Sequence, residues 1–152
     1  AAGHEKDRIG VLASLAGAHR AASRPRDALA ALDEAVKLSQ SMPDASLSFE
    51  LVMLVDGNAV AALYDLGAYD EAWRIAGKLM AQRKLASHTD AANFNNVLLL
   101  AALVAEKRGA PREALDLARQ AGEAARAIGQ TGRNFTSEWA GSLARYAWEA
   151  SR

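Results

Sequence analysis

Three short stretches of this chain repeat the same order of residue types. Each has a small residue, a ring residue two places later, an acidic residue, an alanine and a large apolar residue, and they span Ser23–Leu29, Gly67–Trp73 and Gly109–Leu115. Their alanines, Ala28, Ala72 and Ala114, lie 44 and 42 residues apart. An internal period of this size indicates a stacked array of helices, and such arrays usually bind other molecules.

Composition restricts the class of protein. With 152 residues, 51% of them hydrophobic, and only three prolines, the chain is expected to form one globular domain over residues 1–152. Eighteen basic residues balance eighteen acidic ones, so there is no electrostatic case for nucleic acid or an anionic membrane as partner. The chain has no cysteine, which excludes disulfides, thiol catalysis and thiolate metal sites.

Neither a signal peptide nor a membrane span is expected. Residues 1–10 carry charges where a signal peptide would have an apolar run, and the longest apolar stretch, Val97–Ala105, is too short to cross a bilayer. We therefore expect a cytoplasmic protein. The chain begins with alanine and both of its ends carry helical patterns, as expected for part of a longer polypeptide.

Apolar residues recur at helical spacing and predict an all-α fold of seven helices. The expected helices cover about residues 5–22, 26–39, 46–66, 69–86, 90–108, 111–128 and 134–150. Leu15 and Val36 are expected to face inward. Within a pair the connection is only three or four residues, which produces antiparallel hairpins. The predicted repeats are therefore 5–42, 46–87 and 90–129, followed by a lone helix over 134–150.

The pattern resembles the tetratricopeptide (TPR) repeat. In that motif a small residue begins the second helix, as Ala28, Ala72 and Ala114 do, and another stands twelve places earlier where the two helices cross. Ala16, Val60 and Ala102 occupy those crossing positions, and in the last helix Trp139, Leu143 and Tyr146 match further motif positions. The resemblance implies a right-handed superhelical array, a TPR-like α-solenoid, whose first helices line a concave face.

These repeats, of 41 to 44 residues, are longer than the usual repeat of about 34. Long repeats of this kind are similar to those in bacterial signal-responsive regulators. The resemblance therefore implies a module that binds a protein or peptide segment, as the sensor or scaffold part of a bacterial regulatory protein.

The motif's inward positions and the polar residues of the first helices supply the candidate partner-binding residues. The inward positions include several small residues, Gly10, Ala13, Gly17, Gly57 and Ala61. The expected partner-binding set is Arg20, Leu54, Asn58, Tyr64, Asn96 and Leu99. Asparagine has two donors and an acceptor, which suits it to hold an extended peptide backbone. Two alternatives stay open: the asparagines bond locally within their own helix, or neighbouring parts of the chain fill the groove.

The lone last helix suggests a second function. Without a partner helix it leaves an apolar face open, and that face is a cap, is covered by further sequence, or meets another copy in a homodimer. Trp139, Tyr146 and Trp148 are the residues expected to carry self-association.

No catalytic site is expected. The three histidines, His4, His19 and His88, are not spaced as metal ligands, no glycine-rich phosphate loop follows a strand, and no nucleophile elbow is present. We therefore expect no metal, no cofactor and no enzymatic activity.

Overall fold

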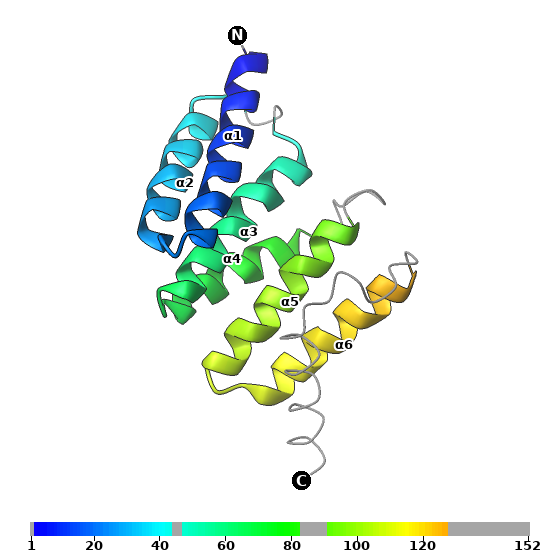
Figure 1. Cartoon of the computed structure of the whole chain (residues 1–152). Helices are drawn as coiled ribbons and strands as arrows, with labels where there is room; N and C mark the ends of the chain where they lie inside the picture. Colours follow the sequence, from blue (N-terminus) through cyan, green and yellow to red (C-terminus); the bar gives the residue numbers. More distant parts are fainter. Residues whose placement is uncertain (1, 44–46, 83–90, 128–152) are drawn as a thin grey trace. The chain divides into compact units, whose positions relative to one another are not determined.

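A computed structural model describes residues 2–43, 47–82 and 91–127. These residues form six helices and no strand (Figure 1). The helices are α1 (Ala2–Ala21), α2 (Pro25–Gln40), α3 (Phe49–Asp65), α4 (Tyr69–Ala81), α5 (Ala91–Lys107) and α6 (Pro111–Ala127). The all-α prediction is confirmed, and the bounds of these helices lie within a few residues of those expected. The predicted seventh helix, 134–150, lies outside the described residues.

The chain divides into two compact units, Ala1–Ile75 and Ala76–Arg152, with the boundary inside α4. The first unit therefore holds α1, α2, α3 and the start of α4. The second holds the end of α4 together with α5 and α6. The expectation of one domain over residues 1–152 stays a prediction.

The repeated stretches form the same helix-ending turn three times. At the second turn, Gly67 has φ 77° and donates its N–H to Tyr64 O at 3.0 Å, while Ala68 N–H donates to Leu63 O at 2.9 Å. These are the two hydrogen bonds of a Schellman motif, which satisfies carbonyls that the helix end leaves without partners. The first turn, at Ser23, and the third, at Gly109, have the same pair of bonds.

Each turn also starts the next helix, which explains the rest of the repeated pattern. Pro25, Tyr69 and Pro111 occupy the first helical position, where proline's fixed φ and missing N–H are tolerated. An acidic residue follows two positions later, near the positive end of the helix dipole, where it is stabilising. The repeated residues of the sequence are thus those that end one helix, form the turn and start the next helix.

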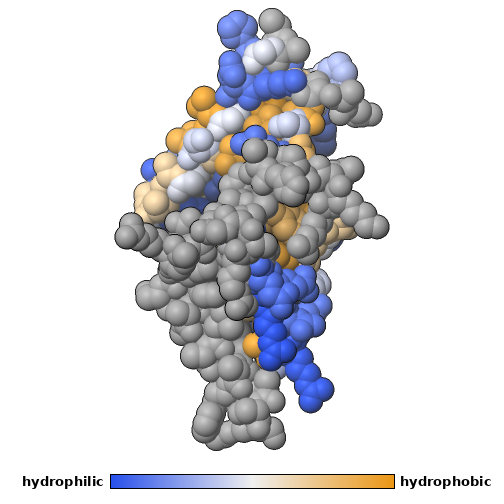
Figure 2. Space-filling model, turned by 90° about the vertical axis from the view of Figure 1, so that its right-hand side faces the viewer, coloured by the Kyte–Doolittle hydropathy of each residue, from blue (hydrophilic) through white to orange (hydrophobic). Residues whose placement is uncertain are grey.

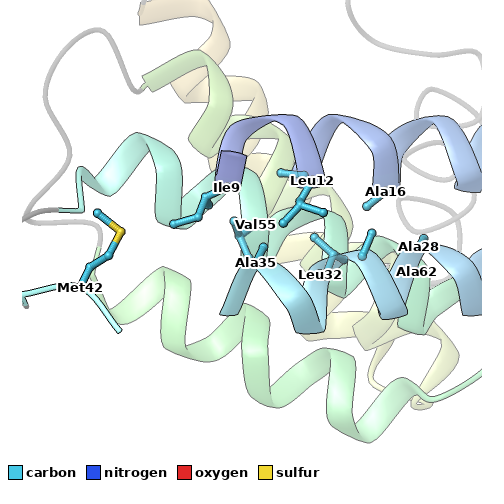
Figure 3. Close-up of a cluster of buried hydrophobic side chains, with 11 residues drawn as sticks. Ile9, Leu12, Ala16, Ala28, Leu32, Ala35, Met42, Val55 and Ala62 are labelled. Carbon is cyan, nitrogen blue, oxygen red and sulfur yellow. The ribbon is translucent and has the colours of Figure 1, made fainter. Parts of the chain in front are cut away.

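Helices α1, α2 and α3 pack against one another around the core of the first unit. Figure 3 shows the buried side chains of this core, contributed by all three helices and by Met42 just after α2. Ala16 of α1 and Ala28 of α2 are fully buried, as the crossing positions of the motif predict. Small residues at a crossing let two helix backbones approach closely.

The second unit uses the same register. Helices α5 and α6 pack against each other, and Ala102 and Ala114 are buried at the positions equivalent to Ala16 and Ala28. The following motif positions of α6, Ala118 and Ala121, are also buried. The register inferred from the repeated turns is therefore confirmed in both units.

Two inward-facing predictions are wrong. Leu15 is 44% exposed and Val36 is 37% exposed. Consecutive helical residues are turned by about 100° from each other. Leu15 is therefore turned away from its buried neighbour Ala16, and Val36 from Ala35. In both helices the core occupies a narrower face than the apolar pattern suggests.

Candidate interaction surface on α1 and α3

Helices α1 and α3 are the first helices of two successive repeats, and they contact each other. A methyl group added at Gly17 of α1 would lie 3.6 Å from Asn58 Oδ1 of α3, which is ordinary van der Waals contact. Four of the six predicted partner-binding residues lie on these two helices. We define the α1–α3 surface by Gly10, Gly17, Arg20, Leu54, Gly57, Asn58 and Tyr64.

Asn58 makes a local hydrogen bond. Its Nδ2 donates to the carbonyl oxygen of Leu54, one turn earlier, at 2.8 Å, and the side chain is half-buried. From the sequence, a local bond of this kind was the alternative to ligand contact, and the structure shows that the bond forms. The bond uses one of the two amide donors and holds the amide in a fixed orientation beside Gly17.

Leu54 is 41% exposed although it lies in the middle of an apolar helix. Gly10 of α1 and Gly57 of α3 border open space, because a methyl group added at either would meet no atom within 4 Å. Ala13 and Ala61, which the motif also assigns to the concave face, are instead buried and unavailable to a partner. The accessible part of this surface therefore includes an exposed leucine, two glycines and one amide.

An ion pair joins the C-terminal ends of α1 and α3. Arg20 Nε lies 2.7 Å from Asp65 Oδ2, and Arg20 Nη2 lies 3.5 Å from Asp65 Oδ1. Asp65 was absent from the predicted set. It follows Arg20 by 45 residues, one more than the repeat spacing, so the period itself places it beside Arg20 on the neighbouring helix. A partner that uses Arg20 has to compete with Asp65.

Tyr64 contacts the following helix. Its ring centroid lies 5.7 Å from that of Tyr69, with the planes tilted by 58°, a geometry typical of favourable aromatic pairs. Tyr69 is the first residue of α4, so the two rings contact each other across the turn at Gly67. Tyr64 remains half-buried, and at this surface it offers part of an aromatic ring.

The remaining two predicted partner-binding residues lie on α5 of the second unit. Asn96 is exposed and Leu99, three residues later on the same helical face, is half-buried. Their side chains can therefore contact one partner segment together.

Next to them lies Asn95, which was not in the predicted partner-binding set. Asn95 is only 3% exposed, and neither Oδ1 nor Nδ2 has a hydrogen-bond partner among the described residues. The repeat register places Asn95 at the position of Ile9 and Met53, both buried and apolar. From the sequence, the repeat register could therefore have predicted that Asn95 occupies a core position.

Trp139, Tyr146 and Trp148, the predicted self-association residues, lie outside the described part of the chain. Within the described ranges, no three His, Asp or Glu side chains are grouped so as to hold a metal ion. Among those same residues, no helix combines the length and apolar character needed to cross a membrane.

The fold has a counterpart among solved structures. No family model matches the sequence, and no curated protein matches it. The crystal structure of a TPR-like protein from Chlorobium tepidum superimposes with a TM-score of 0.75 at 16% sequence identity, covering 99% of this chain and 96% of that one. At this identity the likeness concerns the fold alone. The chain therefore has a TPR-like helical-repeat fold.

Proposed function

We propose that this chain is a non-enzymatic module that binds a protein or peptide segment on the α1–α3 surface. The observation that carries the proposal is the exposed Leu54 beside the oriented amide of Asn58. Burying a leucine side chain contributes about 1.5–3 kcal/mol, and an amide with a remaining donor and an acceptor can hold a peptide backbone group.

The glycines of the surface support the same function. Glycine inside a helix costs about 0.5–1 kcal/mol relative to alanine, yet Gly10 and Gly57 lie within helices and border open space. Without side chains there, a partner backbone can approach α1 and α3 closely. At the end of the surface, the Arg20–Asp65 pair supplies both a donor and an acceptor of hydrogen bonds.

The proposal also includes a second contact on α5 and a role within a larger protein. Asn96 and Leu99 on α5 provide a second contact of the same chemistry, an amide beside an apolar side chain. The role as sensor or scaffold of a bacterial regulatory protein is supported by the repeat spacings of 44 and 42 residues, which resemble those of signal-responsive regulators.

Selection of displayed random peptides against the 152-residue chain tests the proposal. Affinities of the selected peptides for variants would then be measured by fluorescence polarisation. Leu54→Asp is expected to weaken binding at least about tenfold, which corresponds to about 1.4 kcal/mol, and Asn58→Ala is expected to weaken it less. Val36→Asp is the matched control, because Val36 is 37% exposed on α2 and lies outside the α1–α3 surface.

Circular dichroism should show the same helix content in all three variants. Equal affinity of Leu54→Asp and the wild-type chain for every selected peptide would show that the α1–α3 surface is not the binding site.

A further inference from the structure

A second apolar strip lies on α1, and it shares no residue with the α1–α3 surface. Val11, Leu15, Ala18 and Ala22 are all exposed, and at spacings of four, three and four residues they share one face of the helix and its final turn. Val11, at 66%, is the most exposed large hydrophobic residue among the described residues. We call these four residues the outer strip. Figure 2 shows one face of the molecule, with orange hydrophobic side chains at the surface in the upper part of the view.

The repeat register identifies what kind of face the outer strip is. Val11 corresponds to Val55 of α3 and Val97 of α5, and these are 8% and 3% exposed. Ala18 corresponds to Ala62 of α3, which is fully buried. Val55 and Ala62 belong to the core cluster that α3 shares with α1 and α2. Val11 and Ala18 thus occupy positions through which α3 packs into this core, and in α1 both are exposed.

The outer strip is complementary to itself in shape. Its large residues, Val11 and Leu15, form the N-terminal half of the strip, and its small residues, Ala18 and Ala22, form the C-terminal half. If two copies pack with their α1 helices antiparallel, Val11 of each copy meets Ala22 of the second copy and Leu15 meets Ala18. Large side chains then lie over small ones along the whole strip, which allows close helix packing.

Charge favours the same arrangement. One turn before Val11 the helix carries the exposed Asp7, and just beyond Ala22 the chain carries the exposed Arg26. Antiparallel packing brings Asp7 of one copy toward Arg26 of the second copy, while parallel packing would bring like charges together. We propose that the outer strip binds a second copy of this chain, forming a two-fold symmetric dimer with antiparallel α1 helices.

Sedimentation equilibrium of the 152-residue chain tests this proposal. The wild-type chain is expected to dimerise, and Val11→Glu and Leu15→Glu are each expected to weaken the dimer at least tenfold, because each places two buried charges in a symmetric interface. Both positions are exposed in the single chain, so helix content should not change. Val36→Glu is the control of similar exposure and should dimerise like wild type.

Charge reversal tests the orientation. Asp7→Arg should weaken the dimer, and the double variant Asp7→Arg/Arg26→Asp should restore it, because the opposite charges then meet again. A wild-type chain that is monomeric at ~100 μM, a range in which weak but specific dimers assemble, would overturn the proposal. So would dimerisation that both glutamate variants leave unchanged, a result that would place the contact elsewhere, as on Trp139 and Tyr146.

This dimer is independent of partner binding on the α1–α3 surface. Leu54→Asp is expected to lose peptide affinity and keep the dimer, while Leu15→Glu loses the dimer and keeps peptide affinity. The two proposals therefore fail separately.

Discussion

Ser23 is the one non-glycine residue with positive φ in the described part of the chain, and replacing it tests the origin of the repeat pattern. Its φ is 58°, while Gly67 and Gly109 occupy the same place in the other two turns with φ 77° and 76°. The left-handed conformation costs an L-residue roughly 1–2 kcal/mol, and glycine largely avoids that strain. Ser23→Gly therefore removes strain that the other two turns do not have.

An effect on the unfolded state offsets part of this increase in the free energy of unfolding. Glycine raises the conformational entropy of the unfolded chain, which offsets about 0.5–1 kcal/mol. We expect Ser23→Gly to raise the free energy of unfolding by about 0.5–1 kcal/mol and Tm by about 2–3 °C for a chain of this size. Thermal and urea unfolding followed by circular dichroism at 222 nm would measure both.

Two variants serve as controls for this prediction. Ser14→Gly makes the same change inside α1, where φ is helical, and should lower stability by about 0.5 kcal/mol. Gly67→Ala should lower it by about 1 kcal/mol through backbone strain alone, because a methyl group there meets no atom within 4 Å. If Ser23→Gly lowered Tm as Ser14→Gly does, the assignment of strain to Ser23 would be wrong.

Two further predictions concern polar side chains. Asn95→Leu should raise the free energy of unfolding by about 1–3 kcal/mol, because it removes a buried amide without a partner; an unchanged or lower value in urea unfolding would show that Asn95 is satisfied in solution. A double-mutant cycle with Arg20→Ala and Asp65→Ala should give a coupling energy of about 0.5–1 kcal/mol that shrinks in 1 M salt, as expected for a partly exposed bidentate pair; a coupling of zero at low salt would refute the pair.

The scaffold was largely predictable because the determining interactions are local. A helix-ending turn needs a residue that tolerates positive φ, and the helix that follows favours a ring residue and an acidic residue in its first turn. These demands recur in the sequence at Ser23, Gly67 and Gly109. Fully buried Ala16 and Ala28 follow from the same register, since the turn length determines where the paired helices cross.

The candidate site was only partly predictable because its properties depend on which helices meet. Leu15 has the same apolar character as Leu12, yet Leu12 is buried and Leu15 is exposed. Asn58 and Asn95 are the same residue type on equivalent helices, yet Asn58 bonds to its own helix and Asn95 is buried without a partner among the described residues. Hydrophobicity and hydrogen-bonding capacity are present in the sequence, but burial is a property of neighbours.

The amino-acid sequence by itself determined the all-helical repeat, the places of its turns and the small residues at its helix crossings, because each of these depends on contacts within or between adjacent helices. Only the tertiary structure decided which equivalent positions stay open. Val11 and Val55 are chemically identical and occupy the same place in their repeats, but Val55 is 8% exposed within the core that α3 shares with α1 and α2, whereas Val11 is 66% exposed. That difference comes from long-range packing, which buries a repeated position in one helix and leaves it exposed in another.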